Sequence, residues 1–511
     1  MTLRRPLVPL CAVTILATLL LTQSAFLLFI PIFCAAVFFV VFVRGAHSVR
    51  VYGVLSLLMV LLSLYPVLYE ALHTPKRIPY SESTEYRGTV TEVSYGKYAT
   101  TVTVRLTGGA HRGENCGIRL KAKEAPPALF ETIRFHGNVL PSEKVYDKAE
   151  LCRLYAKNVR LCTAVLYDWT ADEPMPSEIS LRQKVYFRLR RSFSQILDGD
   201  TQAMALALLT GDRTGLSSER TDFYRRAGLY PFLCISGIHV MLTAGLFRRI
   251  LNVLHLPPIL QILILFPFLF AFALIGGMSG SVLRACLMAA VLWLAPLFSR
   301  EYDSVSSLCF AYLVLWLFNP YMLFDLGTAL SFAATLGIVL ADQLRHDMPY
   351  PGMGKLFPTL AGSVYASGFT ALLCMENIGG LSLLSPFSNL LAGAVFVPVM
   401  TLLLATAVLC LLPNFAVTKV LLSVLSLADR FLLGLFETIA KAFSGITGSY
   451  AEVSPPALIT GIVALLCIFP LLYALSFAGR KDENRAASVF VLVPYGILAF
   501  FVLFGGFFGN T

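Results

Sequence analysis

Long apolar stretches fill most of this chain and are interrupted by one extended polar region, residues 75–180. A helix needs roughly 20 apolar residues to cross the hydrocarbon core of a bilayer, and stretches of this kind occur on both sides of the polar region. The sequence therefore predicts a polytopic α-helical membrane protein with about 13 transmembrane helices. They are expected near residues 7–26, 28–43, 51–69, 229–247, 257–276, 281–299, 304–320, 324–341, 361–380, 387–412, 415–436, 456–478 and 487–508.

The polar region has the alternation that is typical of β-strands. EYRGTVTEVSYGKYATTVTVRLTGG (85–109) alternates apolar and polar residues on both sides of a Gly-Lys turn, which predicts a hairpin. CGIRLKAK and TIRFHGNVL are predicted as further strands. Five or so short strands favour a small inserted barrel such as an OB-fold, although an immunoglobulin-like sandwich fits the pattern nearly as well.

Two basic amphipathic helices are predicted over residues 181–227. In LRQKVYFRLRRSFSQIL (181–197) the apolar residues recur at helical spacing and no acidic residue separates the cations; RTGLSSERTDFYRR (213–226) ends on two arginines. Such helices most often lie on a lipid surface. The chain thus divides into transmembrane helices over 1–74, an OB-like β domain over 75–180, basic helices over 181–227 and a polytopic domain over 228–511.

Composition and charge support this division and orient it. Hydrophobic residues make up 57% of the 511 residues and charged residues 14%, which excludes a single soluble domain. Arg44 and Arg50 follow the second expected span, and arginine in short loops marks the cytoplasmic side, so the β domain is expected to be extracytoplasmic. The net charge of +10 suits either anionic lipid or a polyanionic substrate. Because the first basic helix then lies outside, an anionic partner is expected there.

The 11 cysteines contain no C-x-x-C pair, and most stand singly in apolar stretches, where they act as small hydrophobic residues. Cys116, Cys152 and Cys162 belong to the β domain. Outside the cytoplasm two of these could form a disulfide, and Cys152 with Cys162 is the pair predicted.

Ionisable residues inside the apolar stretches are candidates for function, because each costs a few kcal/mol to insert and usually faces a bundle interior or water. In FLCISGIHVML (232–242), a helix that starts near Ser236 would point backbone donors at an anion; alternatively Ser236 caps a kink and His239 bonds to a neighbouring helix. Arg284 either snorkels or lines a pore, and Asp325 either caps a helix or lines that pore. The full set is His239, Arg284, Asp325, Glu376, Asp429 and Arg430.

Aromatic and basic residues are interleaved in the first predicted hairpin. This arrangement suits single-stranded nucleic acid, whose bases stack on rings while cations hold its phosphates. The alternative is that the tyrosines pack half-buried on their strands. The nucleic-acid-binding surface predicted for the β domain and the basic helices consists of Tyr95, Lys97, Tyr98, Arg105, Arg188, Arg190, Arg191, Arg225 and Arg226.

An ordered series of motifs resembles the ComEC family of competence proteins. The matching segments are LALLTGDRTGLSSERTDFYRRAGLYPFLCISGIHVMLTAGLF (206–247), GMSGSVLRACLM (277–288), NPYMLFDLGTALSF (319–332) and SPFSNLLAG (385–393). The resemblance implies an inner-membrane channel that imports single-stranded DNA during natural transformation, with no catalytic residues and no cofactor. It also implies a cytoplasmic helicase or ATPase motor, a periplasmic DNA receptor and a separate nuclease as partners. The residues expected along the DNA path are Ser236, Gly237, His239, Arg284, Asp325, Ser331 and Asn389.

Some features depart from the family pattern. Tyr230, Pro231 and Met241 replace smaller residues of the first motif, which leaves the pore dimensions open. The H-x-H-x-D-H metal motif of many relatives does not occur, so no metal nuclease is expected in this chain. A G-x-x-x-x-G-K-[ST] phosphate loop does not occur either, so a separate motor is expected. Two alternatives stay open: a secondary transporter of a small anion, and an intramembrane serine hydrolase that uses Ser236 and His239.

Overall fold

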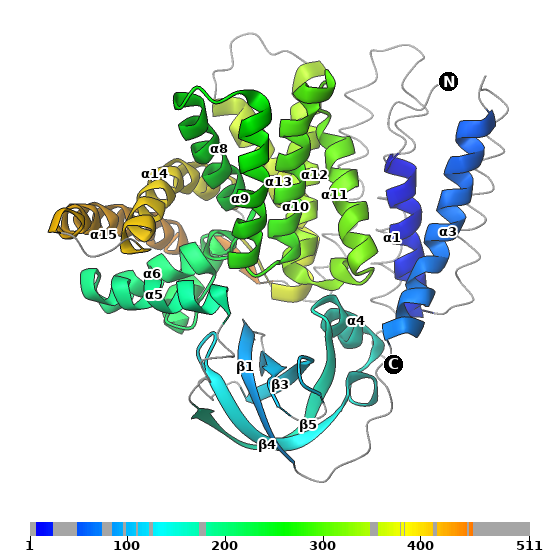
Figure 1. Cartoon of the computed structure of the whole chain (residues 1–511), viewed down its shortest axis with the longest axis horizontal. Coiled ribbons are helices and arrows are strands. Elements are labelled where there is room, and N and C mark those ends of the chain that lie inside the picture. Colours follow the sequence, from blue (N-terminus) through cyan, green and yellow to red (C-terminus); the bar gives the residue numbers. More distant parts are fainter. Residues whose placement is uncertain are drawn as a thin grey trace.

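A helical bundle stands over a small β-barrel, and shorter helices lie beside their junction (Figure 1). The computed structural model describes residues 7–23, 49–73, 84–95, 99–108, 111–121, 126–172, 180–347, 356–378, 380–382, 384–411, 416–446 and 449–452. The spans expected near residues 28–43, 456–478 and 487–508 lie outside the described residues.

Five strands form a closed barrel in the order β1-β2-β3-β5-β4. β3 and β5 pair in parallel, and the other neighbouring strands pair antiparallel. Inward-facing residues such as Val102, Ile118 and Phe135 form the barrel core. Closure confirms the OB-like prediction and excludes a two-sheet sandwich. The strands are β1 (Thr84–Tyr95), β2 (Ala99–Leu106), β3 (Asn115–Lys121), β4 (Thr132–Pro141) and β5 (Val159–Asp172).

A short helix connects β4 to β5 on the side of the barrel that faces the bundle (Figure 1). This helix, α4 (Lys148–Ala156), follows the single turn η2 (Ser142–Lys144). Asp147 caps α4, since its carboxylate accepts the backbone N–H of Glu150 at 2.9 Å. α4 is therefore an ordered helix of the barrel that lies against the membrane helices.

Among the described residues, three helices are long and apolar enough to cross a membrane: Pro258–Ile275, Gly280–Phe298 and Ser385–Leu411. Shorter apolar helices cover Ser56–Leu72, Ser304–Phe318 and Leu326–Asp342. The chain is a membrane protein, while the total of about 13 spans stays a prediction. The bundle contains α1 (Leu7–Gln23), α3 (Val49–His73), α8 (Gly237–Val253), α9 (Pro258–Ile275), α10 (Gly280–Leu294) with the turn η5 (Ala295–Phe298), α11 (Ser304–Phe318), the turn η6 (Met322–Phe324), α12 (Leu326–Asp347), α13 (Leu356–Ile378) and α14 (Ser385–Leu411).

α9 illustrates how these helices meet lipid on one side. Leu263 and Phe270 are 68% and 61% exposed, whereas Leu265 and Leu269 are buried in a core with Trp293 of α10. A soluble protein would not leave such large apolar side chains uncovered along a whole helix face. The exposed face is the surface expected to contact acyl chains.

Shorter helices and one long helix beside the bundle run across the direction of α8 to α11 (Figure 1). α6 (Gly199–Thr210) is buried nearly throughout and packs in a core with Phe396 and Phe436, while its neighbours are α5 (Leu181–Ile196) and α7 (Ser218–Arg226). The long helix, α15 (Ala416–Ser444), covers the span predicted at 415–436 and extends beyond it. It exposes large apolar side chains such as Leu427 and Phe431, whereas Asp429 is buried. Two short strands, β6 (Gly380–Ser382) and β7 (Tyr450–Glu452), pair beside α7.

Candidate functional site

The beginning of α8 is held by the side chains of its own first turn. Residues 230–233 form a single turn, η4 (Tyr230–Leu233), and α8 begins at Gly237 rather than near residue 229 as predicted. The backbone N–H of Ser236 donates to Nδ1 of His239 at 3.1 Å, and the Ser236 hydroxyl lies 3.1 Å from the same nitrogen. The polar residues of this motif therefore cap a helix that starts inside the protein.

The capping contact fixes the tautomer of His239. Because Nδ1 accepts a backbone N–H, a neutral imidazole carries its proton on Nε2. His239 is only 1% exposed, and its ring meets that of Phe396 on α14 edge-on, with centroids 5.0 Å apart. The backbone of Leu208 lies beside this imidazole and offers it an acceptor.

Three of the expected path residues meet around one guanidinium. Arg284, about one turn into α10 and 6% exposed, donates through Nε to the Ser331 hydroxyl of α12 at 3.0 Å. Its Nη1 lies 3.3 Å from Sδ of Met288. A Cβ atom added at Gly237 of α8 would lie 2.6 Å from Nη2, so the guanidinium keeps this position only beside a glycine and would have to shift for a larger residue. Gly237, Arg284 and Ser331 therefore form one cluster, which we call the arginine site.

The charge of the arginine site is not neutralised within the part of the chain that the structure describes. The partners of Arg284 there are a hydroxyl and a thioether, and no described carboxylate forms an ion pair with it. The ring of Phe332 lies 5.8 Å from the guanidinium and adds a cation–π contact. A buried cation with only neutral partners carries an uncompensated desolvation cost. The site is electrostatically suited to an anion.

Asp325 does not pair with Arg284. Its Oδ2 accepts the backbone N–H of Thr328 at 2.9 Å and the Thr328 hydroxyl at 2.8 Å, which is the N-cap role considered from the sequence. A Cβ at Gly280 of α10 would lie 2.2 Å from that hydroxyl, so α10 and α12 pack closely beside the cap. Asp325 thus orders the start of α12.

Substitution of Asp325 separates capping from charge. We expect Asp325→Ser to keep stability within about 0.5 kcal/mol, because serine is an equally good N-cap, and Asp325→Ala to lose about 1 kcal/mol. Thermal unfolding of the two purified variants measures the difference. Equal losses in both would show that the negative charge matters more than the cap.

Asn389 is partly buried on α14 and forms no hydrogen bond to Arg284 among the described residues. Its neighbour Ser388 is fully buried and donates to the backbone carbonyl of Ala227 at 2.6 Å. The start of α14 is therefore tied to the end of α7, while a place for Asn389 on the same path as Arg284 stays a prediction.

The basic helices are partly neutralised by partners that were not considered from the sequence. Arg225 and Arg226 lie 3.5 and 2.9 Å from carboxylate oxygens of Asp222 on α7 itself. Arg188 donates to the carbonyl of Cys410 at the end of α14, at 3.3 Å. Arg190 and Arg191 are exposed on α5. These last two are the cations of the predicted surface that remain most accessible on the basic helices.

The β domain agrees only in part with the residues expected there. Arg105 is exposed on β2, but Lys97, Tyr98 and the side chain of Tyr95 lie outside the described residues. The predicted disulfide between Cys152 and Cys162 is wrong for this structure, in which both are buried thiols. Cys152 packs on α4 among tyrosines, whereas the Cys162 thiol lies on β5, 3.7 Å from the Leu140 carbonyl. Their sites are separate because α4 turns away from the strands.

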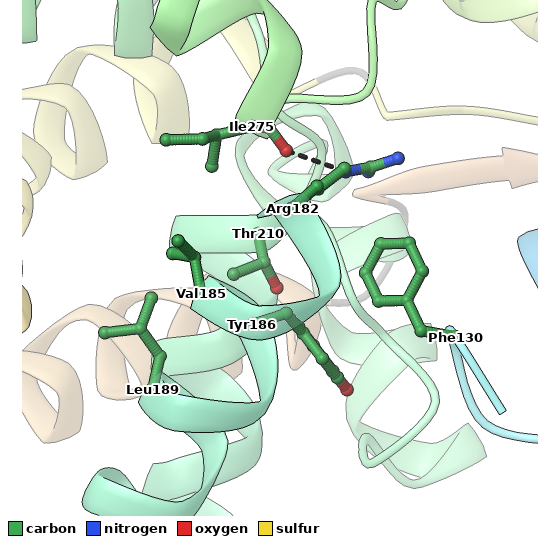
Figure 2. Close-up of a pocket in the computed structure, with 7 residues that line it drawn as sticks. All are labelled: Phe130, Arg182, Val185, Tyr186, Leu189, Thr210 and Ile275. Carbon is green, nitrogen blue, oxygen red and sulfur yellow. Dashed lines mark hydrogen bonds between the residues drawn. The ribbon is translucent and has the colours of Figure 1, made fainter. Parts of the chain in front are cut away.

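Sequence reasoning missed a contact between the barrel and α5. Arg182 lies with its guanidinium 4.8 Å from the ring centroid of Phe130, and its Nε donates to the carbonyl of Ile275 at the end of α9, at 2.9 Å. Phe130 and Tyr186 meet edge-on at 5.1 Å. These residues line a small, mainly apolar pocket (Figure 2). Arg182 was visible as part of a basic helix, but nothing in the pattern around Phe130 indicated its partner.

Comparison with known proteins identifies the family of this chain. One curated relative, ComE operon protein 3 of Bacillus subtilis (strain 168), is 28% identical over 296 residues. That match covers 58% of this chain but 36% of the relative, so the chain spans only about a third of that protein. No solved structure matches. The family model for competence proteins matches residues 208–478, which include the arginine site and more than half of the chain. The chain therefore belongs to the competence protein family.

Proposed function

We propose that this protein is a channel in the bacterial inner membrane through which single-stranded DNA enters the cell during natural transformation, and that it is not an enzyme. The observation that carries this proposal is the arginine site, a buried guanidinium without a carboxylate partner among the described residues. Guanidinium groups bind phosphate, as they bind carboxylate, through paired N–H donors. Membership of the competence protein family supports the same substrate.

The surroundings of the site support contacts that are several and weak. The start of α8 adds a positive dipole end beside Arg284. A polymer in motion requires such a series, because one tight site would trap it. Arg190 and Arg191, exposed on α5, would hold phosphates before the strand reaches the membrane.

The barrel and separate partner proteins would carry out the remaining steps of DNA import. The barrel is extracytoplasmic and receives the strand, either directly or from a periplasmic DNA receptor. A cytoplasmic helicase or ATPase motor pulls the strand, and a separate nuclease supplies it in single-stranded form. Lipid covers the exposed apolar faces such as that of α9.

Uptake of fluorescently labelled DNA tests the proposal. Cells that lack the chain should show only background import, and the intact gene supplied on a plasmid should restore it. The same protein reconstituted in liposomes should not accumulate phosphate or another small anion. Saturable uptake of a small anion, together with normal DNA import in the deletion strain, would establish a secondary transporter instead.

The serine hydrolase alternative is addressed by the same cap geometry. His239 Nδ1, the nitrogen nearest the Ser236 hydroxyl, is also the acceptor for a backbone N–H. A base shared in this way is poorly arranged to remove a proton from serine. Covalent labelling of Ser236 by a fluorophosphonate reagent would support hydrolysis, and we expect none.

A further inference from the structure

We propose that Asn319 is the positioning residue that seats the barrel over the end of the bundle from which the strand is received. Its Nδ2 donates to the carbonyl of Tyr155 at 2.8 Å and to that of Ala156 at 3.2 Å, both at the end of α4. It also lies 3.3 Å from Oδ1 of Asn158. On the other side, its Oδ1 accepts the backbone N–H of Tyr321 at 3.0 Å. One amide therefore joins the barrel to the turn between α11 and α12.

The contact meets a need of both partners. The last carbonyls of a helix find few donors within that helix. The Tyr155 carbonyl accepts the backbone N–H of Asn158 at 3.0 Å, and the carbonyls of both Tyr155 and Ala156 accept the side-chain amide of Asn319. α4 ends just before Asn158, whose φ of 55° stops the helix in the left-handed conformation. Asn319 is 7% exposed, so water cannot readily replace it. The end of α4 thus receives a further donor from a residue of the membrane domain, and this makes the contact specific for one docked orientation.

Aromatic packing surrounds this amide. Tyr155 of α4 and Tyr321 meet edge-on at 5.6 Å, and Tyr69 of α3 lies 6.5 Å from Tyr321. The guanidinium of Arg160, on β5, lies 3.6 Å from the centroid of the Tyr155 ring. The joint therefore includes a strand and helix of the barrel, α3, and the turn before α12. We call this set of contacts the α4 joint.

Charges beside the α4 joint hold the same surfaces together. Lys157 lies 2.5 Å from a carboxylate oxygen of Glu92 on β1. Burial alone would lower the pKa of Lys157, but the carboxylates of Glu92 and Asp325 outweigh it and raise that pKa. Lys157 thus stays charged at neutral pH and attracts the start of α12, where Asp325 lies.

A second contact, which does not involve α4, attaches the barrel to α5. Phe130, between β3 and β4, is 5% exposed and lies against Arg182 and Tyr186 of α5 (Figure 2). Its φ of 66° is unusual for an aromatic residue, and such a conformation persists only where its surroundings fix it. A body held at two separate places keeps its orientation. If the proposed function is correct, the barrel always delivers the strand toward the arginine site.

The substitution Asn319→Asp tests the α4 joint with almost no change in shape. The carboxylate still accepts the N–H of Tyr321, but it places an oxygen against the carbonyls of Tyr155 and Ala156, where a donor is required. In the full chain in lipid nanodiscs, we expect amide hydrogen exchange in peptides covering residues 148–160 to become roughly tenfold faster. Peptides of β4 should keep their protection, because the barrel core is untouched. DNA uptake should fall roughly tenfold in cells.

Asn252→Asp is the matched control, since Asn252 is exposed near the end of α8. It should change neither exchange nor uptake. Unchanged exchange over residues 148–160 in Asn319→Asp would overturn the joint, and faster exchange with full uptake would overturn its positioning role. Failure of the proposed function is distinguishable, because the unaltered chain would then restore no DNA uptake although its α4 joint is protected. Loss of β4 protection as well would show a fold defect and would also count against a positioning role.

Discussion

Arg284→Ala should abolish DNA uptake, to roughly a hundredth of the unaltered level or less, without loss of protein stability. The guanidinium is the one cation of the arginine site, and its removal leaves translocating phosphates without a charged partner there. Because the described residues offer it no carboxylate, deletion removes an uncompensated buried charge rather than an ion pair. A purely structural arginine would behave differently, since its loss would lower the unfolding temperature. Uptake of labelled DNA and thermal unfolding of the purified variant measure the two quantities.

Two further substitutions sharpen this result. Arg284→Lys keeps the charge but loses the planar fork that reaches both Ser331 and Met288, so partial uptake is expected. Arg300→Ala removes an exposed arginine just beyond η5 and should leave uptake unchanged. An Arg284→Ala protein that imports DNA normally would refute the proposed role of the arginine site.

Gly237→Ala should reduce uptake nearly as strongly, although it adds only one methyl group. The new Cβ would lie 2.6 Å from Nη2 of Arg284, a distance that real Cβ atoms do not tolerate, and the guanidinium must therefore move. Alanine itself favours a helix by up to about 1 kcal/mol over glycine. α8 should consequently remain intact while the arginine site is disturbed, and DNA uptake together with circular dichroism separates the two effects.

Gly245→Ala provides the matched control on the same helix. A Cβ at Gly245 meets no atom within 4 Å, so uptake should be unaffected. The double variant Gly237→Ala with Arg284→Lys should recover part of the DNA uptake that Gly237→Ala loses, because lysine has no Nη2 to collide with the methyl group. If Gly237→Ala and Gly245→Ala behaved alike, close approach of Arg284 to α8 would not matter for transport.

Some of the site could be predicted because its signals are local. Ser236, His239 and Asp325 stand at helix starts, and their capping contacts span only three residues. Their polar character inside apolar stretches was enough to mark them. The pairing of Arg225 and Arg226 with Asp222 is also local, because residues three and four apart lie on the same helix face, but it was not considered from the sequence.

The apolar stretches and the alternation of residues 85–109 determined the membrane-protein class and the presence of β-strands, because the length needed to cross lipid and the two-residue period of a strand are properties of neighbouring residues. Closure of the strands into a barrel rather than a sandwich was decided by tertiary structure. Which polar groups meet was decided only by tertiary structure. Arg284 reaches Ser331 across 47 positions, and Asn319 reaches Tyr155 across 164. No local pattern encodes such distances. They arise when helices pack closely enough for glycines such as Gly237 to admit a side chain, and when the barrel docks through α4.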